Sequence, residues 1–190
     1  MGRVLIGVFL GVVLVSLAVL AWIHFGNVPV AVADPPLPHE SSITGAALHA
    51  RIDRELVATP PIQVNEENLV AGAHVYHDQC AACHGFHGKP SSFGAHMYPA
   101  APPLFEMHHH GSETMMGVTD DPPGETYWKV ANGIRLSGMP SYKQVLDDTQ
   151  MWQVSLLLAN ADKPLPPAAL AFLRGESVPS PAPAAKVGKE

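Results

Sequence analysis

The sequence predicts a small all-α domain that follows a single N-terminal transmembrane helix. Three observations support this prediction. An apolar run near the start is long enough to span a bilayer, apolar side chains recur at helical spacing in later segments, and little of the chain alternates as a strand would. At 190 residues, the chain has room for one ordinary domain with appendages.

The apolar run extends from Val4 to Phe25, and we assign residues 1–26 to a membrane anchor. A helix of about 20 residues crosses a bilayer. Arg3 precedes the run, so the start is expected to stay in the cytoplasm and the rest of the chain to lie outside it. The alternative is a signal sequence cleaved after Ala33, although a signal core of about 7–15 residues is shorter than this run.

Two further segments flank the expected domain. Residues 27–63 read as a proline-rich spacer that includes a helix over residues 40–58, with Leu48, Ile52 and Leu56 on one face. Residues 162–190 are rich in proline and alanine and are expected to be a disordered tail.

The domain between them, residues 64–161, is expected to contain three helices, over residues 66–79, 125–132 and 148–160. Asn65 is the expected N-cap of the first helix, and Gly133 is the expected left-handed cap that ends the second. Asp147 and Gln150 are expected to cap the third. Residues 85–123 read as a long loop, and such loops are usually functional or wrapped around something. About 100 residues with so few helices make a thin core, which a cofactor would strengthen.

The stretch CAACH holds the only two cysteines, Cys80 and Cys83, followed at once by His84. A thioredoxin-like redox pair needs a βαβ pattern, and none surrounds it. A zinc site typically needs two such pairs. C-x-x-C-H is the signature of covalent haem c attachment. Two thiols at this spacing can meet the two vinyl groups of a porphyrin, which leaves His84 under the iron. We therefore expect one covalent haem c.

A methionine is the expected second axial ligand of the iron. The segment Gly138-Met139-Pro140 places the Met139 thioether on a rigid turn after a short helix. Other thioethers and imidazoles lie downstream of the haem motif, and a histidine could instead displace Met139. The other methionines are Met97, Met107, Met115, Met116 and Met151.

With these residues, the chain resembles the class I c-type cytochromes of the bacterial membrane-anchored monohaem kind. The resemblance covers residues 64–161. It implies a small fold of about three to five helices around one haem, in which Gly72 and Tyr76 meet the helix that bears Trp152. The matching residues are Gly72, Tyr76, Cys80, Cys83, His84, Gly85, Pro103, Leu104, Trp128, Asn132, Gly133, Ile134, Arg135, Gly138, Met139, Pro140 and Trp152.

The resemblance also implies roles for individual residues. His84 would be the proximal iron ligand, and Pro103 would lie beside it, where its carbonyl or a neighbour's accepts the ring N–H. Met139 would be the distal ligand. Arg135 would contact a haem propionate, with a solvated surface arginine as the alternative.

A histidine run at His108–His110 departs from the family pattern. Together with nearby methionines it offers ligands that suit copper. The alternative is a polar surface loop, and we expect no second metal there.

These features predict a one-electron carrier rather than an enzyme, because protein ligands on both sides of an iron leave no place for a substrate. It would work in a respiratory chain at the membrane, between a quinol-oxidising complex or dehydrogenase and a terminal oxidase or reductase. The formal net charge of −6 argues against nucleic acid as a partner. One alternative is a haem c subunit of a dehydrogenase or oxidase complex. Another is a gas- or peroxide-binding haem, which requires that Met139 does not bind the iron.

Overall fold

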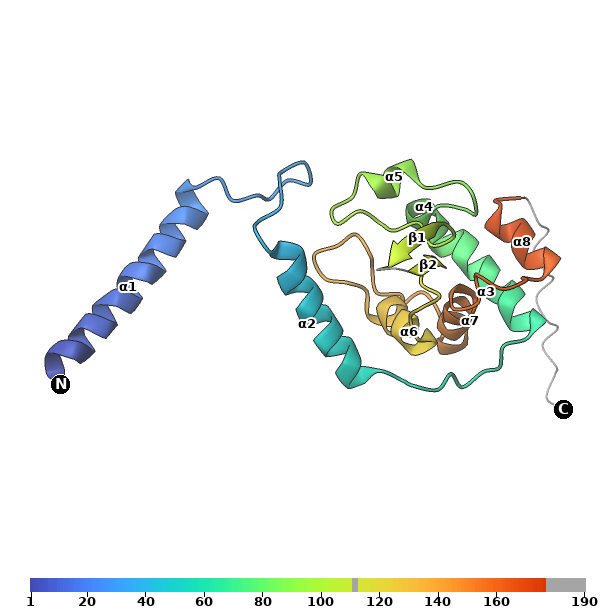
Figure 1. Cartoon of the computed structure of the whole chain (residues 1–190), viewed down its shortest axis with the longest axis horizontal. Coiled ribbons are helices and arrows are strands. Elements are labelled where there is room, and N and C mark those ends of the chain that lie inside the picture. Colours follow the sequence, from blue (N-terminus) through green and yellow to red (C-terminus); the bar gives the residue numbers. More distant parts are fainter. Residues whose placement is uncertain (111–112, 177–190) are drawn as a thin grey trace. The chain divides into compact units, whose positions relative to one another are not determined.

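The computed structural model describes residues 1–110 and 113–176. It divides into two compact units, Met1–Thr44 and Gly45–Glu190. Figure 1 shows the elements along the chain. The helices are α1 (Gly2–Phe25), α2 (Glu40–Glu55), α3 (Glu66–Gln79), α4 (Ala81–His84), α5 (Ser92–Ala95), α6 (Pro123–Asn132), α7 (Asp148–Leu158) and α8 (Pro167–Leu173), and the strands are β1 (Met107–His110) and β2 (Glu113–Met116).

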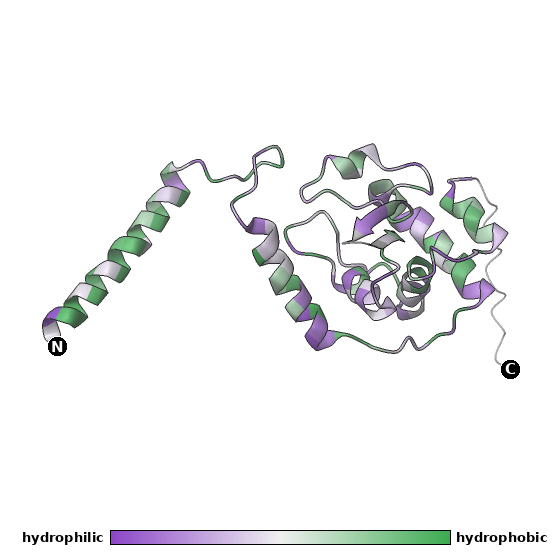
Figure 2. Cartoon of the chain, viewed as in Figure 1, coloured by the Kyte–Doolittle hydropathy of each residue, from purple (hydrophilic) through white to green (hydrophobic). Residues whose placement is uncertain are grey.

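Helix α1 is the expected apolar helix. The helix has 24 residues, and its most apolar stretch of 18 residues has a mean hydropathy of 3.0. No part of that stretch is buried within the protein. Figure 2 shows this helix mostly in the green of hydrophobic residues. Length and composition suit a helix that crosses a membrane, and a signal sequence near an N-terminus meets the same criteria.

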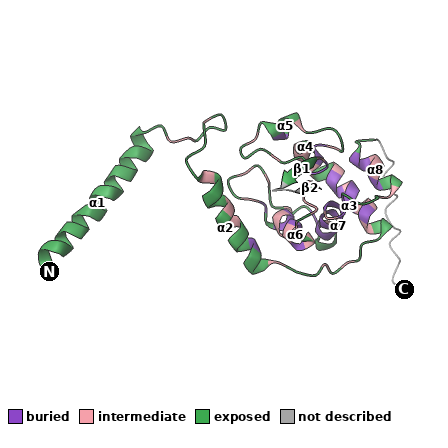
Figure 3. Cartoon of the chain, viewed as in Figure 1, coloured by how far each residue is buried: buried purple, intermediate pink, exposed green. Residues whose placement is uncertain are grey.

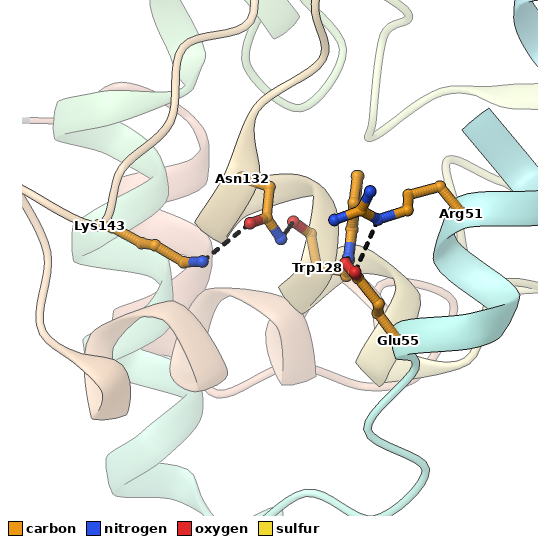
Figure 4. Close-up of polar contacts among 5 residues, drawn as sticks. All are labelled: Arg51, Glu55, Trp128, Asn132 and Lys143. Atoms are coloured by element: carbon orange, nitrogen blue, oxygen red, sulfur yellow. Dashed lines mark hydrogen bonds and ion pairs between the residues drawn. The ribbon is translucent and has the colours of Figure 1, made fainter. Parts of the chain in front are cut away.

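Helix α2 forms where the spacer was expected to be helical, and it ends at Glu55 rather than at residue 58. Within the larger unit, Ile52 is only 1% exposed. The Glu55 carboxylate accepts a hydrogen bond from the Trp128 indole of α6, with Nε1 and Oε2 2.9 Å apart. It also pairs with Arg51 at 2.6 Å (Figure 4). The end of α2 is therefore attached to the helical domain.

Helices α3 and α7 form the centre of the domain, and their crossing agrees with the expectation drawn from the family resemblance. Asn65 caps α3 by accepting a hydrogen bond from Asn68 N. Where the helices cross, a Cβ on Gly72 would lie 2.3 Å from the carbonyl oxygen of Gln153, so only glycine fits. The expected capping box of Asp147 and Gln150 opens α7.

Helix α6 packs against α7 and completes this core. The ring of Tyr127 stacks on Trp152 with centroids 4.1 Å apart. The Tyr127 hydroxyl donates a hydrogen bond to the Asp148 carboxylate at the start of α7. Trp152 is buried, which agrees with a packing role for this side chain.

The long loop expected over residues 85–123 contains more structure than the sequence analysis allowed. Strands β1 and β2 form an antiparallel hairpin in which Met107 pairs with Met116 and His108 with Met115. Helix α5 is a single turn capped by the Ser91 side chain. Neither strand has β-branched alternation, but a Gly-Ser pair between two short segments is a known hairpin signal that could have been used.

The expectation of a disordered tail from residue 162 is wrong for its first part. Pro167 opens α8, which packs on α3 and buries Ala169, Phe172 and Leu173. Figure 3 shows buried segments on α3, α7 and α8. The proline and alanine content of the whole tail concealed this short apolar run, whose burial stabilises the helix. Residues 177–190 lie outside the described residues.

Candidate functional site

Both cysteines lie at the junction of α3 and α4. Cys80 ends α3 and begins α4, and the backbone N–H groups of Cys83 and His84 both donate to the Cys80 carbonyl, at 3.1 and 3.0 Å. The two thiols are free and half-buried. Burial, reinforced by the neighbouring Cys83, raises the pKa of the Cys80 thiol to about 12. The Cys80 thiol therefore stays neutral near pH 7.

His84, at the end of α4, has one of its ring nitrogens engaged. Its Nδ1 lies 2.8 Å from the carbonyl oxygen of Pro102. A carbonyl can only accept, so Nδ1 carries the proton and Nε2 keeps its lone pair. Burial lowers the pKa of the imidazole, against the opposite effect of the Pro102 carbonyl. The ring is thus neutral and oriented, as an axial ligand must be.

The proline beside His84 is Pro102, whereas the sequence prediction named Pro103 and allowed a neighbour's carbonyl. Pro103 itself is exposed. The choice between two adjacent prolines depends on which carbonyl turns toward the ring, and that is a matter of loop conformation rather than residue type. Any contact of Pro103 with a haem stays a prediction.

The turn after His84 depends on Gly85 and Tyr76. Gly85 has φ of 79°, and a Cβ there would lie 2.6 Å from the carbonyl oxygen of Lys89. The fully buried Tyr76 hydroxyl donates to the Gly85 carbonyl at 2.7 Å. Its ring meets Phe105 edge-on with centroids 4.9 Å apart. Tyr76 therefore has a hydrogen-bonding role that the sequence analysis, which expected packing alone, missed.

The loop that carries Met139 is held through its own backbone. Met139 N donates to Ser137 Oγ at 3.2 Å, and the Met139 carbonyl accepts from Ile134 N at 3.2 Å. Ser137 Oγ in turn donates to the Ile134 carbonyl at 2.7 Å. The Met139 side chain is half-buried against the core. These hydrogen bonds fix the backbone from which the Met139 side chain extends.

Gly133 is essential to this loop for a reason different from the one expected. Its φ of 67° is positive, but its ψ of −179° lies far from the left-handed cap that the sequence analysis predicted. A Cβ at Gly133 would lie 2.6–2.8 Å from backbone atoms of Met139, Pro140 and Ser141. The glycine therefore allows α6 to end directly against the methionine loop.

Tyr142 joins the methionine loop to the cysteine segment. Its hydroxyl donates to the carbonyl of Gln79, the residue before Cys80, at 2.7 Å. Burial raises the pKa of Tyr142 to about 12, and the nearby Cys80 and Cys83 act in the same direction. Met139, three residues before Tyr142, is thereby held close to the segment that bears the two thiols and His84.

Three family-matching residues on or after α6 do not meet the cysteine segment in the described contacts. Trp128 binds Glu55, and the Asn132 amide donates to the Trp128 carbonyl at 2.9 Å while accepting from Lys143 at 2.8 Å (Figure 4). Arg135 is exposed. Its expected contact with a propionate stays a prediction.

The histidine run lies on strand β1. His109 and Thr114 are linked across the hairpin by a hydrogen bond of 3.0 Å. Among the side chains that the structure describes, those of residues 1–109 and 114–176, no group of three or more His, Cys, Asp or Glu residues could hold a metal ion. The side chain of His110 lies outside the described residues.

The donor set fits a haem c. Two free thiols occupy one helical turn, and the next residue is a neutral imidazole whose Nε2 is available. The loop that carries the Met139 thioether is joined by Tyr142 to Gln79, the residue before Cys80. Soft and borderline donors of these kinds suit iron in a porphyrin.

Comparison with known families agrees with this chemistry. Residues 67–156 match the family model described as cytochrome c oxidase, cbb3-type, subunit III. No curated protein matches the chain. The matched residues include both cysteines, His84 and Met139. On these grounds residues 67–156 form a domain of the c-type cytochrome family, whose function is haem-based electron transfer.

Proposed function

We propose that this protein is a one-electron carrier that holds a single covalent haem c between His84 and Met139. The observation that carries the proposal is the bond from the Tyr142 hydroxyl to the Gln79 carbonyl. It fastens the methionine loop to the segment with Cys80 and Cys83, so that residues 63 positions apart share one site.

Each residue proposed to hold the haem would have a separate task. The thiols of Cys80 and Cys83 would form the thioether links, and His84 Nε2 would bind one face of the iron while Nδ1–H stays on the Pro102 carbonyl. Met139 would bind the other face. The haem would supply one-electron oxidation and reduction, and buried side chains such as Leu104 and Phe105 would keep water from its surroundings.

Filled axial positions favour electron transfer over substrate chemistry. A His/Met pair raises the reduction potential relative to other ligand pairs. Gas or peroxide binding would require Met139 to leave the iron, against the two backbone hydrogen bonds that hold it in its loop. The closed loop therefore argues against a sensing or catalytic haem.

Helix α1 would anchor the carrier in the bacterial inner membrane with the haem domain in the periplasm. Anchoring raises the local concentration of the carrier at membrane partners. Those partners would be a quinol-oxidising complex or dehydrogenase and a terminal oxidase or reductase. The net charge of −6 favours partners with basic residues around their electron port.

A second candidate function is that of a haem c subunit within an oxidase complex. The matching family model describes a subunit of a cytochrome c oxidase. A stable subunit needs an apolar contact surface, and Phe93 on α5 and Tyr98 just after α5 are 66% and 39% exposed. Solubilisation of native membranes in mild detergent separates the two functions: a carrier migrates alone, whereas a subunit migrates with the oxidase.

The experiment that tests the haem ligation compares ferric and ferrous spectra, with and without carbon monoxide, for the wild type and for Met139→Ala. We expect the wild type to show the far-red band of a methionine–iron bond and to ignore carbon monoxide. Met139→Ala should lose the band and bind the gas. Met107→Ala, at a methionine 59% exposed on the hairpin, is the matched control and should behave as the wild type. A wild type that binds carbon monoxide would contradict the carrier function.

A further inference from the structure

The segment from Ser91 to Pro102 is fastened to α4 at both ends and in its middle. Ser91 Oγ donates to the Ala82 carbonyl at 2.6 Å, and the Pro102 carbonyl accepts from His84. Between them, Gly94 lies so close to the Cys83 carbonyl that a Cβ there would be 1.9 Å from its oxygen. This segment, called here the cover segment (residues 91–102), therefore moves with the cysteine and histidine turn.

Hydrogen bonds within the cover segment give it a definite shape. The Gly94 carbonyl accepts from Met97 N at 3.2 Å and from Ala101 N at 3.0 Å. Gly94 N donates back to Ser91 Oγ at 3.1 Å. Met97 is thus presented from a closed turn and not from a free loop, and its side chain is half-buried.

Met97 reaches the loop that carries Met139. A Cβ built on Gly138 would lie 1.7 Å from the terminal methyl carbon of Met97 and 3.4 Å from its sulfur. Among the described residues, no other atom lies within 4 Å of that position, apart from the neighbours of Gly138 in the chain. Gly138 is the residue before Met139, so the Met97 methyl group lies directly against the backbone that presents the thioether.

The two sides of the methionine loop are held differently. The side toward α6 is fixed by Gly133 and by the hydrogen bonds of Ile134 and Ser137. The outer side is open: Leu136 is 87% exposed, and Gly138 is exposed as well. On this outer side, Met97 is the long-range contact that the structure gives at Gly138.

We propose that Met97 is a positioning residue for the distal iron ligand, which it restrains by packing on Gly138. The proposal rests on the proposed ligation by Met139. It joins the two halves of the site, because the cover segment is attached to the His84 turn and its Met97 side chain holds the loop of the opposite ligand. An outward movement of that loop, which detaches Met139, has to break this contact.

The expected effect is modest and measurable. Loss of one buried methyl or methylene group changes an equilibrium by about fourfold, equivalent to about 0.8 kcal/mol. Met97 is half-buried and packs on the exposed Gly138, so Met97→Ala should raise the population with Met139 detached by up to about fourfold. Met97→Leu keeps most of the volume without the sulfur and should restore behaviour close to the wild type.

Imidazole titration of the full-length ferric protein measures the detached population, because added imidazole binds the iron only when Met139 has left it. The far-red band reports loss of the methionine–iron bond as imidazole is added. We expect up to about fourfold tighter apparent imidazole binding for Met97→Ala and little change for Met97→Leu. Met107→Ala serves as the control for loss of a methionine elsewhere.

A double-mutant cycle tests whether the contact with Gly138 is responsible. Gly138 does not adopt positive φ, so alanine suits its backbone, and its added Cβ would displace the Met97 methyl. Gly138→Ala should tighten imidazole binding in the wild type, and its effect should shrink in the Met97→Ala background.

Three results would overturn the proposal. The first is an imidazole affinity that does not change in Met97→Ala. If the wild type keeps its methionine–iron band, this result overturns the role of Met97 and leaves the proposed ligation intact. The second is full additivity in the double-mutant cycle, which excludes the direct contact. The third is a wild type without the band, because then Met139 is not the ligand and the proposed ligation fails together with the role of Met97.

Discussion

Replacement of Gly133 by alanine should detach the methionine loop from the end of α6. The backbone at Gly133, with φ of 67° and ψ of −179°, lies in a region that only glycine readily adopts. An added Cβ would also approach three backbone atoms of residues 139–141 to within 2.6–2.8 Å. Backbone cannot swing aside as the end of a side chain can, so the loop has to move.

The cost has two parts. A non-glycine residue in this region costs about 1–3 kcal/mol, and overpacking against fixed neighbours costs about 1–3 kcal/mol more. We therefore expect Gly133→Ala to lower the free energy of unfolding by about 2–6 kcal/mol. Much of that loss should appear as displacement of Met139, since its carbonyl is one of the three atoms approached.

Gly88 provides the matched control. Its φ is 72°, nearly the same as that of Gly133, but a Cβ there would meet nothing within 4 Å. Gly88→Ala should therefore show the cost of positive φ without the collision. For a domain of this size, about 1 kcal/mol shifts Tm by about 4–8 °C, so Gly133→Ala should melt at least about 4 °C below Gly88→Ala.

Thermal unfolding of both holoproteins, with the far-red methionine–iron band recorded at room temperature, checks this prediction. Gly133→Ala should lose much of the band, and Gly88→Ala should keep it. Equal melting temperatures with an intact band in both variants would show that the approach of Gly133 to the methionine loop is not what requires glycine there.

Other contacts lead to three further predictions. Tyr76→Phe leaves the Gly85 carbonyl without its buried donor and should lower the free energy of unfolding by about 1–3 kcal/mol in denaturant titration; a wild-type value would show that water replaces the hydroxyl. Phe172→Ala removes a ring that is 5% exposed and meets the His74 ring edge-on, with centroids 5.1 Å apart. It should lower the free energy of unfolding by about 3–5 kcal/mol and leave the methionine–iron band unchanged. Loss of the band would contradict a purely structural role for α8. Burial and the hydrogen bond to Asp148 raise the pKa of Tyr127 from 10.0 to about 12. The contribution of Tyr127 to the free energy of unfolding is therefore complete below about pH 10 and is lost as the pH rises toward 12. Chemical denaturation across this range should show a fall in stability that is smaller in Tyr127→Phe.

The helices and the haem motif were predictable because their signals are local. Asn65 and the pair Asp147 and Gln150 cap helices within a single turn, so residue type decides the outcome. The spacing of Cys80, Cys83 and His84 likewise encodes its chemistry within five residues. In these cases the physical cause and the sequence signal lie in the same stretch of chain.

The parts that sequence reasoning missed depend on contacts between distant segments. The short helix α8 exists because Phe172 and Leu173 find a surface on α3, and composition alone hides such a partner. The choice of Pro102 over Pro103 depends on which carbonyl faces His84. The approach of Met97 to Gly138 joins residues 41 positions apart, and neither residue type announces it.

These contacts divide the site into a stiff half and a compliant half. His84 is held by helix α4, by the Pro102 carbonyl and by a turn that Tyr76 fixes from the core. Met139 depends on a surface loop whose outer side meets Met97 at Gly138. If Met139 binds the iron as proposed, any change in coordination should therefore begin with the methionine. Since a His/Met pair holds the potential higher than other pairs do, the packing of Met97 should also help to keep the potential of the carrier high.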